Sequence, residues 1–299
     1  MSRKLRFIVA AMQEEPWPEM IQRWQRVEAL GFDGVMLADH FVNYEQPNAH
    51  WFEAWTLLSA LATQTKSIRI SVLSAVPWRN PAFLARQAMT VDHISNGRLE
   101  LGLGAGAPGS DDISYAMTGT PDWPAKERVE RFREVVEIVD QLLRNPESSY
   151  EGHYYQLKGT IINPLPVQKP RPPLIIGANR PQMLKIVARY ADTWNTFGGM
   201  EVKSQAEMLK LTQARNRRLD ELCAEIGRDP SSLERSILIF THEEYRQLYS
   251  TPGAFEEIVK RYWEIGISGF YFFYPFVPEL MPMFEHIAQE AIPRLREAL

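Results

Sequence analysis

The chain has 299 residues, of which 45% are hydrophobic, so it can bury a sizeable core as one large domain or as two ordinary ones. A formal net charge of -4 and scattered Lys and Arg residues give no basic surface, which excludes a nucleic-acid partner. The apolar run from Phe7 to Met12 is too short to span a membrane, and a single cysteine, Cys223, excludes an intramolecular disulfide or thiolate metal site, so we expect a cytoplasmic protein with no membrane partner.

Strand-like apolar segments alternate with helix-like segments along the whole chain. Strands are expected at Arg6 to Ala11, Gly34 to Ala38, Arg69 to Ala75, Arg98 to Leu103, Leu174 to Gly177, Thr193 to Thr196, Ser236 to Phe240 and Gly269 to Phe273. Helices are expected at Pro18 to Leu30, Ala54 to Thr63, Pro81 to His93, Ala125 to Leu143, Pro181 to Tyr190, Ser204 to Ile226, Pro252 to Ile265 and Glu279 to Ala298. This alternation predicts an α/β fold with a single (β/α)8 TIM-barrel domain over residues 1–299, and an open doubly wound sheet is the alternative.

Two connections are longer than usual for a barrel. An extended loop, Gly104 to Pro124, follows strand 4, and another, Asn145 to Pro173, follows helix 4. Long loops in compact domains are usually functional. We expect the first loop at the catalytic face, where it can act as a lid, and the second as a structural excursion with a short hairpin at Tyr150 to Leu157.

The exit of the fourth strand is rich in glycine. Its Gly104-x-Gly106-x-x-Gly109 spacing matches a dinucleotide-binding pattern, but Pro108 stands where the helix would already run, and no acidic ribose ligand follows at the required distance. The bare amides of this exit suit a phosphate or a ring. Close packing of a neighbouring element is the structural alternative.

In a barrel, active residues lie at the carboxyl ends of the strands, where the loops converge. The second strand ends in Asp39 and His40. A histidine there can transfer a proton, and the adjacent carboxylate can fix its tautomer or bind a ligand. A pair that only caps the next turn is the alternative.

Two further strand ends suit a coenzyme. The third strand ends in the small residues Ser74 and Ala75, which fit a flat ring or plain packing equally well. The fifth ends in Gly177, followed by the Ala178-Asn179-Arg180 segment, just before Pro181 opens a helix. Free amides and a cation at a helix start predict a phosphate site.

Aromatic and titratable residues give weaker signals. Trp51 and Trp55 flank Glu53 and can line a pocket for a planar ligand, although packing is the commoner role of such side chains, and Trp194 is expected in the barrel interior. The remaining histidines show no metal-ligand spacing, so no metal site is predicted. No strand end carries a lysine placed for Schiff-base chemistry.

Six segments, in order along most of the chain, carry a resemblance to a known family. They are Leu37-Ala-Asp-His-Phe41, Trp55-Thr-Leu-Leu-Ser-Ala-Leu-Ala62, Arg79-Asn-Pro-Ala-Phe-Leu-Ala-Arg-Gln87, Ser95-Asn-Gly-Arg-Leu-Glu-Leu-Gly-Leu-Gly-Ala-Gly106, Tyr150-Glu-Gly-His-Tyr-Tyr155, and Pro172-Pro-Leu-Ile-Ile-Gly177 with Ala191-Asp-Thr-Trp194. Together they resemble the bacterial luciferase-like superfamily, and within it the branch that uses the 8-hydroxy-5-deazaflavin coenzyme F-420.

The resemblance implies where the coenzyme lies. Its ring would rest at the barrel mouth on a bulge of the third strand, often with a cis non-proline peptide, here near Leu73-Ser74, and His40 beside the ring would serve proton transfer. The tail phosphate would lie on the two glycine-rich exits. The coenzyme contacts so implied are Asp39, Leu73, Ser74, Ala75, Ala105, Gly106, Gly177, Ala178 and Asn179.

The chain departs from this branch at two positions. The sugar-phosphate dehydrogenases of the branch carry a catalytic glutamate where Ala107 stands, and Tyr44 takes the place of their aromatic neighbour of the histidine. Glu53, Tyr44 or Asp111 can replace that acid, and Glu53 joins His40 as an expected catalytic residue. The expected substrate contacts are Tyr44, Trp51 and Trp194.

Three classes of function follow from the resemblance. The first is a deazaflavin-dependent oxidoreductase that transfers a hydride to or from a small organic substrate. The second is a monooxygenase that uses reduced FMN and oxygen, and the third is a non-catalytic flavin-binding barrel. The Asp39-His40 pair favours the deazaflavin over FMN, because FMN members more often carry a glutamate there. A homodimer is left open.

Overall fold

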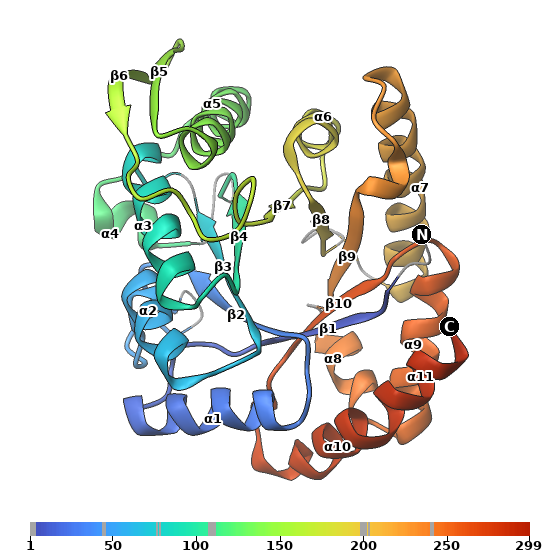
Figure 1. Cartoon of the computed structure of the whole chain (residues 1–299). Coiled ribbons are helices and arrows are strands. Elements are labelled where there is room, and N and C mark those ends of the chain that lie inside the picture. Colours follow the sequence, from blue (N-terminus) through green and yellow to red (C-terminus); the bar gives the residue numbers. More distant parts are fainter. Residues whose placement is uncertain are drawn as a thin grey trace. The chain divides into compact units, whose positions relative to one another are not determined.

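The structure, a computed structural model, describes residues 4–43, 46–75, 77, 79–106, 112–197, 202, 204–239 and 242–299. Eight strands in the described part of the chain form a closed barrel in the order β1-β10-β9-β8-β7-β4-β3-β2, and helices connect them (Figure 1). The predicted TIM barrel is therefore confirmed, and the open doubly wound sheet is wrong.

The barrel strands begin and end within two residues of their predicted bounds. They are β1 (Arg6–Ala10), β2 (Gly34–Asp39), β3 (Arg69–Ala75), β4 (Leu99–Gly104), β7 (Leu174–Gly177), β8 (Thr193–Thr196), β9 (Glu234–Ile239) and β10 (Gly269–Phe273). Most of their side chains are buried. This is expected of parallel strands, whose two faces are both covered.

Seven of the predicted helices are present. They are α1 (Trp17–Ala29), α2 (Ala54–Gln64), α3 (Pro81–Ile94), α5 (Ala125–Arg144), α6 (Pro181–Tyr190), α7 (Gln205–Glu225) and α9 (Pro252–Glu264). Three short elements are not predicted, because so few residues do not show a helical period. They are α4 (Ser114–Thr118), the 3-10 turn η2 (Pro230–Ser232) and α8 (His242–Leu248).

The eighth predicted helix, Glu279 to Ala298, is interrupted. The structure divides this stretch into the 3-10 turn η3 (Pro278–Leu280), α10 (Met281–His286), the π-helical turn η4 (Ile287–Ala291) and α11 (Ile292–Ala298). Pro293 lacks an amide hydrogen for the regular helical bond, and the wider π-helical turn lies just before it. The predicted helix is therefore present from Met281 to Ala298, with a π-helical turn within it.

The chain divides into two compact units. The first unit comprises Met1–Met12, Arg23–Met36 and Ala178–Leu299, and the second comprises Gln13–Gln22 and Leu37–Gly177. That residues 1–299 form one domain stays a prediction.

In the second unit, three neighbouring strands run parallel and end at the same edge. β3 pairs with β4 in unbroken register from Ile70 to Ala75, where Ala75 lies opposite Gly104. Leu103 of β4 lies in turn opposite Ile176 of β7. Because the strands are parallel and in register, their carboxyl ends present Ala75, Gly104 and Gly177 side by side.

The bulge and the cis peptide implied for the third strand are not found at Leu73-Ser74. Among the described peptide bonds, the cis ones precede Pro164 and Pro170. Regular pairing of β3 with β4 through Ala75 leaves no extra residue for a bulge in this stretch. At Leu73-Ser74 itself the peptide bond is therefore trans and the pairing with β4 regular, while residue 76, directly after Ala75, lies outside the described residues.

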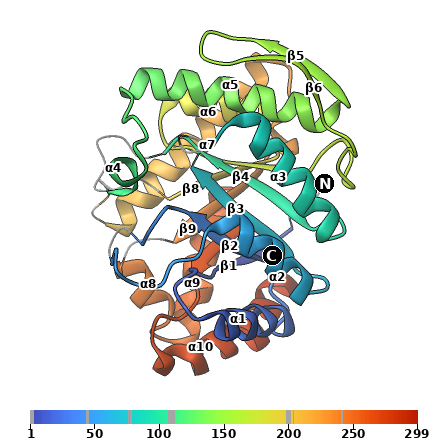
Figure 2. The ribbon, with the colours of Figure 1, turned by 90° about the vertical axis from the view of Figure 1, so that its left-hand side faces the viewer.

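The predicted hairpin is confirmed in the loop after α5. β5 (Glu147–Glu151) and β6 (Gln156–Ile161) pair antiparallel and lie beside α5 (Figures 1 and 2). The buried carboxylate of Glu134 on α5 accepts hydrogen bonds from the backbone N–H groups of the turn, at His153, Tyr154 and Tyr155. A charged acceptor with three donors ties the hairpin to the helix.

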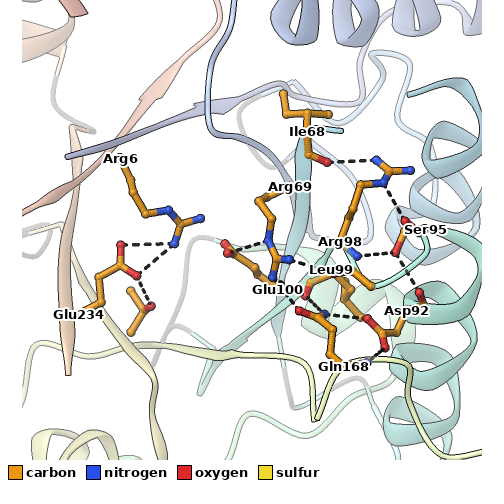
Figure 3. A network of polar contacts seen from close by, with 12 residues as sticks. Arg6, Ile68, Arg69, Asp92, Ser95, Arg98, Leu99, Glu100, Gln168 and Glu234 are labelled. Atoms are coloured by element: carbon orange, nitrogen blue, oxygen red, sulfur yellow. Dashed lines mark hydrogen bonds and ion pairs between the residues drawn. The ribbon is translucent and has the colours of Figure 1, made fainter. Parts of the chain in front are cut away.

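A network of side-chain hydrogen bonds joins the amino ends of β3 and β4 to neighbouring segments of the second unit (Figure 3). The guanidinium of Arg98 donates to the backbone carbonyls of Ala62, Thr65, Ile68 and Ser95 at 2.6 to 3.2 Å. Arg69 bonds the carboxylate of Glu100 and the amide oxygen of Gln168 in the same network. These contacts satisfy carbonyls at the turn between α2 and β3.

We expect the Arg98→Ala variant to lose about 2 kcal/mol of unfolding free energy, because several partly buried carbonyls lose their donor together. Urea unfolding of the two proteins measures this loss. The matched control is Arg133→Ala, whose side chain is 48% exposed and pairs with Glu137 one turn away. That variant should lose less than about 0.5 kcal/mol. Equal losses of unfolding free energy in both variants would show that the Arg98 network stabilises the fold no more than an exposed ion pair does.

In the first unit, β10 lies between β1 and β9, parallel to both. The ring of Phe7 on β1 stacks on Phe270 of β10 at 5.7 Å and packs against Phe255 of α9 at 5.7 Å. At the amino ends, Arg6 pairs with Glu234 at 3.1 Å (Figure 3). Aromatic packing therefore fills the core, and an ion pair holds the strand starts together.

Candidate active site

Asp39, at the carboxyl end of β2, is held by an arginine. Both carboxylate oxygens of Asp39 bind the Arg79 guanidinium, at 2.5 Å to Nη2 and 3.0 Å to Nε. The side chains are only 4% and 19% exposed, respectively. This two-point contact occupies the carboxylate that is expected to bind the coenzyme. The sequence gives Arg79 only as part of a family segment, and its pairing is a finding of the structure.

Glu53 caps the start of α2. Its carboxylate accepts hydrogen bonds from the backbone N–H of Trp55 at 3.2 Å and of Thr56 at 2.7 Å, and a third from Arg79 at 2.7 Å. Burial alone would raise the pKa of Glu53, but these hydrogen bonds hold it below the ordinary value. The contacts favour an ionised, helix-capping carboxylate. Its catalytic role stays a prediction.

His40 is paired with an aspartate from the loop after β4. Its Nδ1 lies 2.9 Å from Oδ2 of Asp112, and its backbone carbonyl accepts a hydrogen bond from Trp51 Nε1 at 2.8 Å. An ionised carboxylate can only accept, so the ring nitrogen Nδ1 carries the hydrogen. In the neutral ring, Nε2 then carries the lone pair that can take a proton. Sequence reasoning names Asp111 instead, which lies outside the described residues.

Asp112 is itself fixed in place. Its Oδ1 accepts the backbone N–H of Ser114 at 3.0 Å, and its side chain is only 9% exposed. Burial alone would raise the pKa of Asp112, but hydrogen bonds from His40 and Ser114 hold it below the ordinary value of 3.8. The group is therefore ionised at neutral pH.

This lowered pKa gives Asp112 a pH-dependent share of the stability. A carboxyl whose folded pKa lies below its unfolded value stabilises the fold above the unfolded value, and the contribution is lost as the pH falls through the folded pKa. We expect Asp112→Asn to be less stable than the wild type at pH 6, and the gap to shrink below pH 3.8. Urea unfolding from pH 6 to pH 3 measures the gap. A gap that is constant over this range would contradict the assignment.

Leu73, Gly104 and Gly177 form a half-exposed surface at the strand ends. A Cβ atom built on Gly104 or on Gly177 would lie 3.9 Å from Cδ1 of Leu73, so one leucine side chain borders both glycines. The preceding residues of the neighbouring strands, Leu103 and Ile176, are fully buried. A surface with one side chain and two bare backbones suits a flat ring.

The other expected contacts at these strand ends are placed differently. Ser74 is fully buried, and its Oγ accepts a hydrogen bond from Trp55 Nε1 at 2.9 Å, so its side chain points toward α2.

Gly106, after the end of β4, has a positive φ of 73°, and a Cβ there would collide with the Tyr115 hydroxyl and Pro77. The approach of Tyr115 is therefore one reason for a glycine at this position. Ala105 beside it is half-exposed, and Tyr44 and Ala107 lie outside the described residues.

In the first unit, the segment after β7 is anchored by the backbone and by Trp194. Ala178 donates its N–H to the Asn195 carbonyl at 3.0 Å, and its own carbonyl accepts from Trp194 Nε1 at 2.8 Å. Trp194 is fully buried, as expected for the interior, and its contact with a substrate stays a prediction. The side-chain oxygen of Asn179 accepts a hydrogen bond from Thr196 Oγ1 at 2.7 Å.

Arg180 precedes α6 and makes no side-chain cap, so the first-turn amides of this helix suit an anion.

Gln13 is a site residue that the sequence analysis misses. It is fully buried in the second unit, and its Nε2 donates to the carbonyl of Ala38, next to Asp39. Its Oε1 is buried without a hydrogen-bond partner among the described residues. A buried acceptor of this kind costs free energy unless something donates to it, so it is a candidate partner for a bound ligand.

Two other kinds of feature are absent from the described residues. They contain no group of three or more His, Cys, Asp or Glu side chains that could hold a metal ion. No described helix combines the length and the apolar character needed to cross a membrane.

Comparison with known proteins gives matches over most of the chain. A model of a family described as luciferase-like monooxygenase matches residues 6–270. A coenzyme F-420-dependent glucose-6-phosphate dehydrogenase of Microbacterium testaceum is 31% identical over 213 residues, which cover 70% of this chain and 61% of that protein. The enzyme of the same name from Amycolatopsis mediterranei is 32% identical over 196 residues, covering 64% and 56%. The chain therefore spans less than two thirds of the length of these relatives.

A solved structure agrees with the fold. The coenzyme F-420-dependent tetrahydromethanopterin reductase from Methanopyrus kandleri superposes with a TM-score of 0.78 and covers 98% of this chain and 99% of its own. The sequences are 17% identical, so this likeness concerns the fold alone.

Proposed function

Since the chain belongs to the luciferase-like monooxygenase family, we propose that it is an oxidoreductase that uses the deazaflavin coenzyme F-420 to exchange a hydride with a small organic substrate. The observation that carries the proposal is the His40–Asp112 pair, 2.9 Å apart, in the same unit as the surface of Leu73, Gly104 and Gly177. The pair provides a proton-transfer group, and the surface provides a place where a flat ring can bind. The names of the relatives with about 31% identity support the choice of coenzyme.

The chain's residues fit this coenzyme in two ways. When bound, the coenzyme supplies a ring carbon that exchanges a hydride with the substrate. Leu73 and the two bare glycines suit the ring because neither glycine places a side chain beside that of Leu73. Within the second unit, the backbone amides at Ala105 and Gly106 are suitable donors for the tail phosphate.

In this mechanism His40 handles the proton. During oxidation of an alcohol, the carbinol C–H bond breaks with loss of a hydride, and Nε2 of His40 accepts the hydroxyl proton, which leaves a ketone. Reduction runs the same steps in reverse. Asp112 is a positioning residue, because its carboxylate holds Nδ1–H and stabilises the imidazolium that forms.

A monooxygenase with reduced FMN is the second candidate function. The description of the family model favours it, because it names monooxygenases. The non-catalytic barrel is a weaker candidate, since binding alone does not require a histidine that is oriented by a buried carboxylate. The cytoplasmic location and the homodimer stay predictions.

Anaerobic turnover distinguishes the two coenzymes. The protein is mixed with oxidised coenzyme F-420 and a panel of alcohols and sugar phosphates, and absorbance of the oxidised deazaflavin is followed without oxygen. We expect the absorbance to fall with at least one substrate. Turnover that occurs only with reduced FMN and oxygen would overturn the proposal.

A further inference from the structure

Exposed apolar side chains flank the site residues of the second unit in sequence. Phe41 directly follows His40, Phe52 lies between Trp51 and Glu53, and Ile113 directly follows Asp112. Met117 lies one turn later, on α4. These four side chains, which we call the apolar rim, are 57%, 38%, 36% and 53% exposed for Phe41, Phe52, Ile113 and Met117.

The hydrogen bonds of the site bring these loops together. The loop after β2 is joined to the loop after β4 by the His40–Asp112 contact, and its two ends are joined by the bond from Trp51 to the His40 carbonyl. The four exposed side chains therefore lie on loop segments that meet at His40. Large exposed apolar side chains on the loops of a candidate site favour a binding surface.

The charges of the same loops are strongly biased. The described residues of the segments 40–53, 76–80 and 105–124, which follow β2, β3 and β4, include three carboxylates, Glu53, Asp112 and Asp122, and a single Lys or Arg, Arg79. Arg79 is already paired with Asp39 and Glu53. A phosphate dianion among these loops would meet like charges and no uncommitted cation of the loops themselves, which disfavours its binding.

We propose that the substrate that meets His40 is a neutral and largely apolar molecule, such as a secondary alcohol or its ketone, rather than a phosphate ester. This inference rests on the proposed function and deepens it. It concerns only the substrate beside His40, because the phosphate of the coenzyme is proposed to lie on backbone amides. The apolar rim provides the contact area, and the acidic loops select against anionic substrates.

Equilibrium binding of three small ligands tests the substrate class. Cyclohexanol, glucose and glucose 6-phosphate are titrated into the protein, with and without saturating oxidised coenzyme F-420, and tryptophan fluorescence is recorded because Trp51 lies in the region. We expect cyclohexanol to bind at least about tenfold more tightly than glucose 6-phosphate, with glucose no tighter than cyclohexanol. Tighter binding of glucose 6-phosphate would overturn the inference.

Two rim variants and a matched control locate the contact. Phe41→Ser and Phe52→Ser should each weaken cyclohexanol binding by about tenfold, because each removes a large apolar contact. Ile94→Ser is the control, since Ile94 is 42% exposed and ends α3, at the amino ends of the strands in the same unit. It should change the affinity less than about twofold. Surface substitutions of this kind seldom cost more than about 0.5 kcal/mol, so the variants should fold.

A charge variant completes the test. Met117→Lys adds a cation to the rim and should raise the affinity for glucose 6-phosphate severalfold while it weakens that for cyclohexanol. Unchanged cyclohexanol affinity in all three rim variants would contradict the proposed contact. The proposed function fails separately, if coenzyme F-420 itself neither binds nor turns over.

Discussion

His40→Asn should lower turnover by about 10² to 10⁴, because it removes a general acid or base from the transition state. The affinity for the coenzyme should stay within about a few-fold, since an interaction made mainly in the transition state does not contribute to ground-state binding. Single-turnover rates measured under saturating coenzyme, together with a binding titration, separate the two effects. Asparagine retains a side-chain donor for Asp112, so the loop after β4 keeps its anchor.

The control for this prediction is His93→Asn. His93 is exposed and lies in the last turn of α3, where Nε2 contacts the Leu165 carbonyl at 2.9 Å. Its loss should leave turnover within about twofold. If His40→Asn keeps normal turnover at neutral pH, the histidine has only a structural role, and the proton must pass through another group, such as Glu53.

Arg79→Ala should lower the free energy of unfolding by about 3 to 5 kcal/mol, because it removes the cation that binds both oxygens of the buried Asp39 carboxylate. Asp39 is only 4% exposed at its side chain, so water cannot replace both lost hydrogen bonds. The same substitution removes a contact from Glu53, the cap of α2. Chemical denaturation of wild type and variant measures the loss.

A second pair of variants tests whether the loss of this cation beside the buried carboxylate is the cause. Arg79→Lys keeps the cation but not the two-point contact, so it should lose less than Arg79→Ala. Adding Asp39→Asn to Arg79→Ala removes the buried charge and should recover part of the stability. If Arg79→Ala costs less than about 1 kcal/mol, the pair is not important for the fold.

The long elements of the fold could be predicted from the sequence, because each carries many periodic apolar positions and clear ends. Pro81 and Pro181 begin helices where expected, and the four-residue β7 and β8 have the predicted bounds. The C-terminal helix could not be predicted as it is. Apolar periodicity continues through this stretch and does not show the change from α-helical to π-helical hydrogen bonding at Ile287–Ala291.

The site is predictable at its strand ends and much less so in its loops. The Asp39-His40 pair follows from barrel geometry alone, because β2 must end at the mouth. Its partners do not follow, since Arg79 and Asp112 lie 40 and 72 residues away along the chain and meet their partners only through loop conformation.

Side-chain direction on β3 is a third case. The period of two tells us that Leu73 and Ser74 face opposite sides of the sheet, but it does not tell which of them faces the barrel interior. The hydrogen bond from Trp55 to Ser74 decides this, and it leaves Leu73 on the half-exposed side.

The most direct test of the proposed function is an equilibrium titration of the purified protein with coenzyme F-420 and with FMN. The two coenzymes share a tricyclic ring, so the comparison isolates what distinguishes them. We predict tighter binding of coenzyme F-420, and a Gly104→Val variant, which places a side chain beside Leu73, should weaken it. Tighter binding of FMN, or no binding of the deazaflavin at all, would contradict the account.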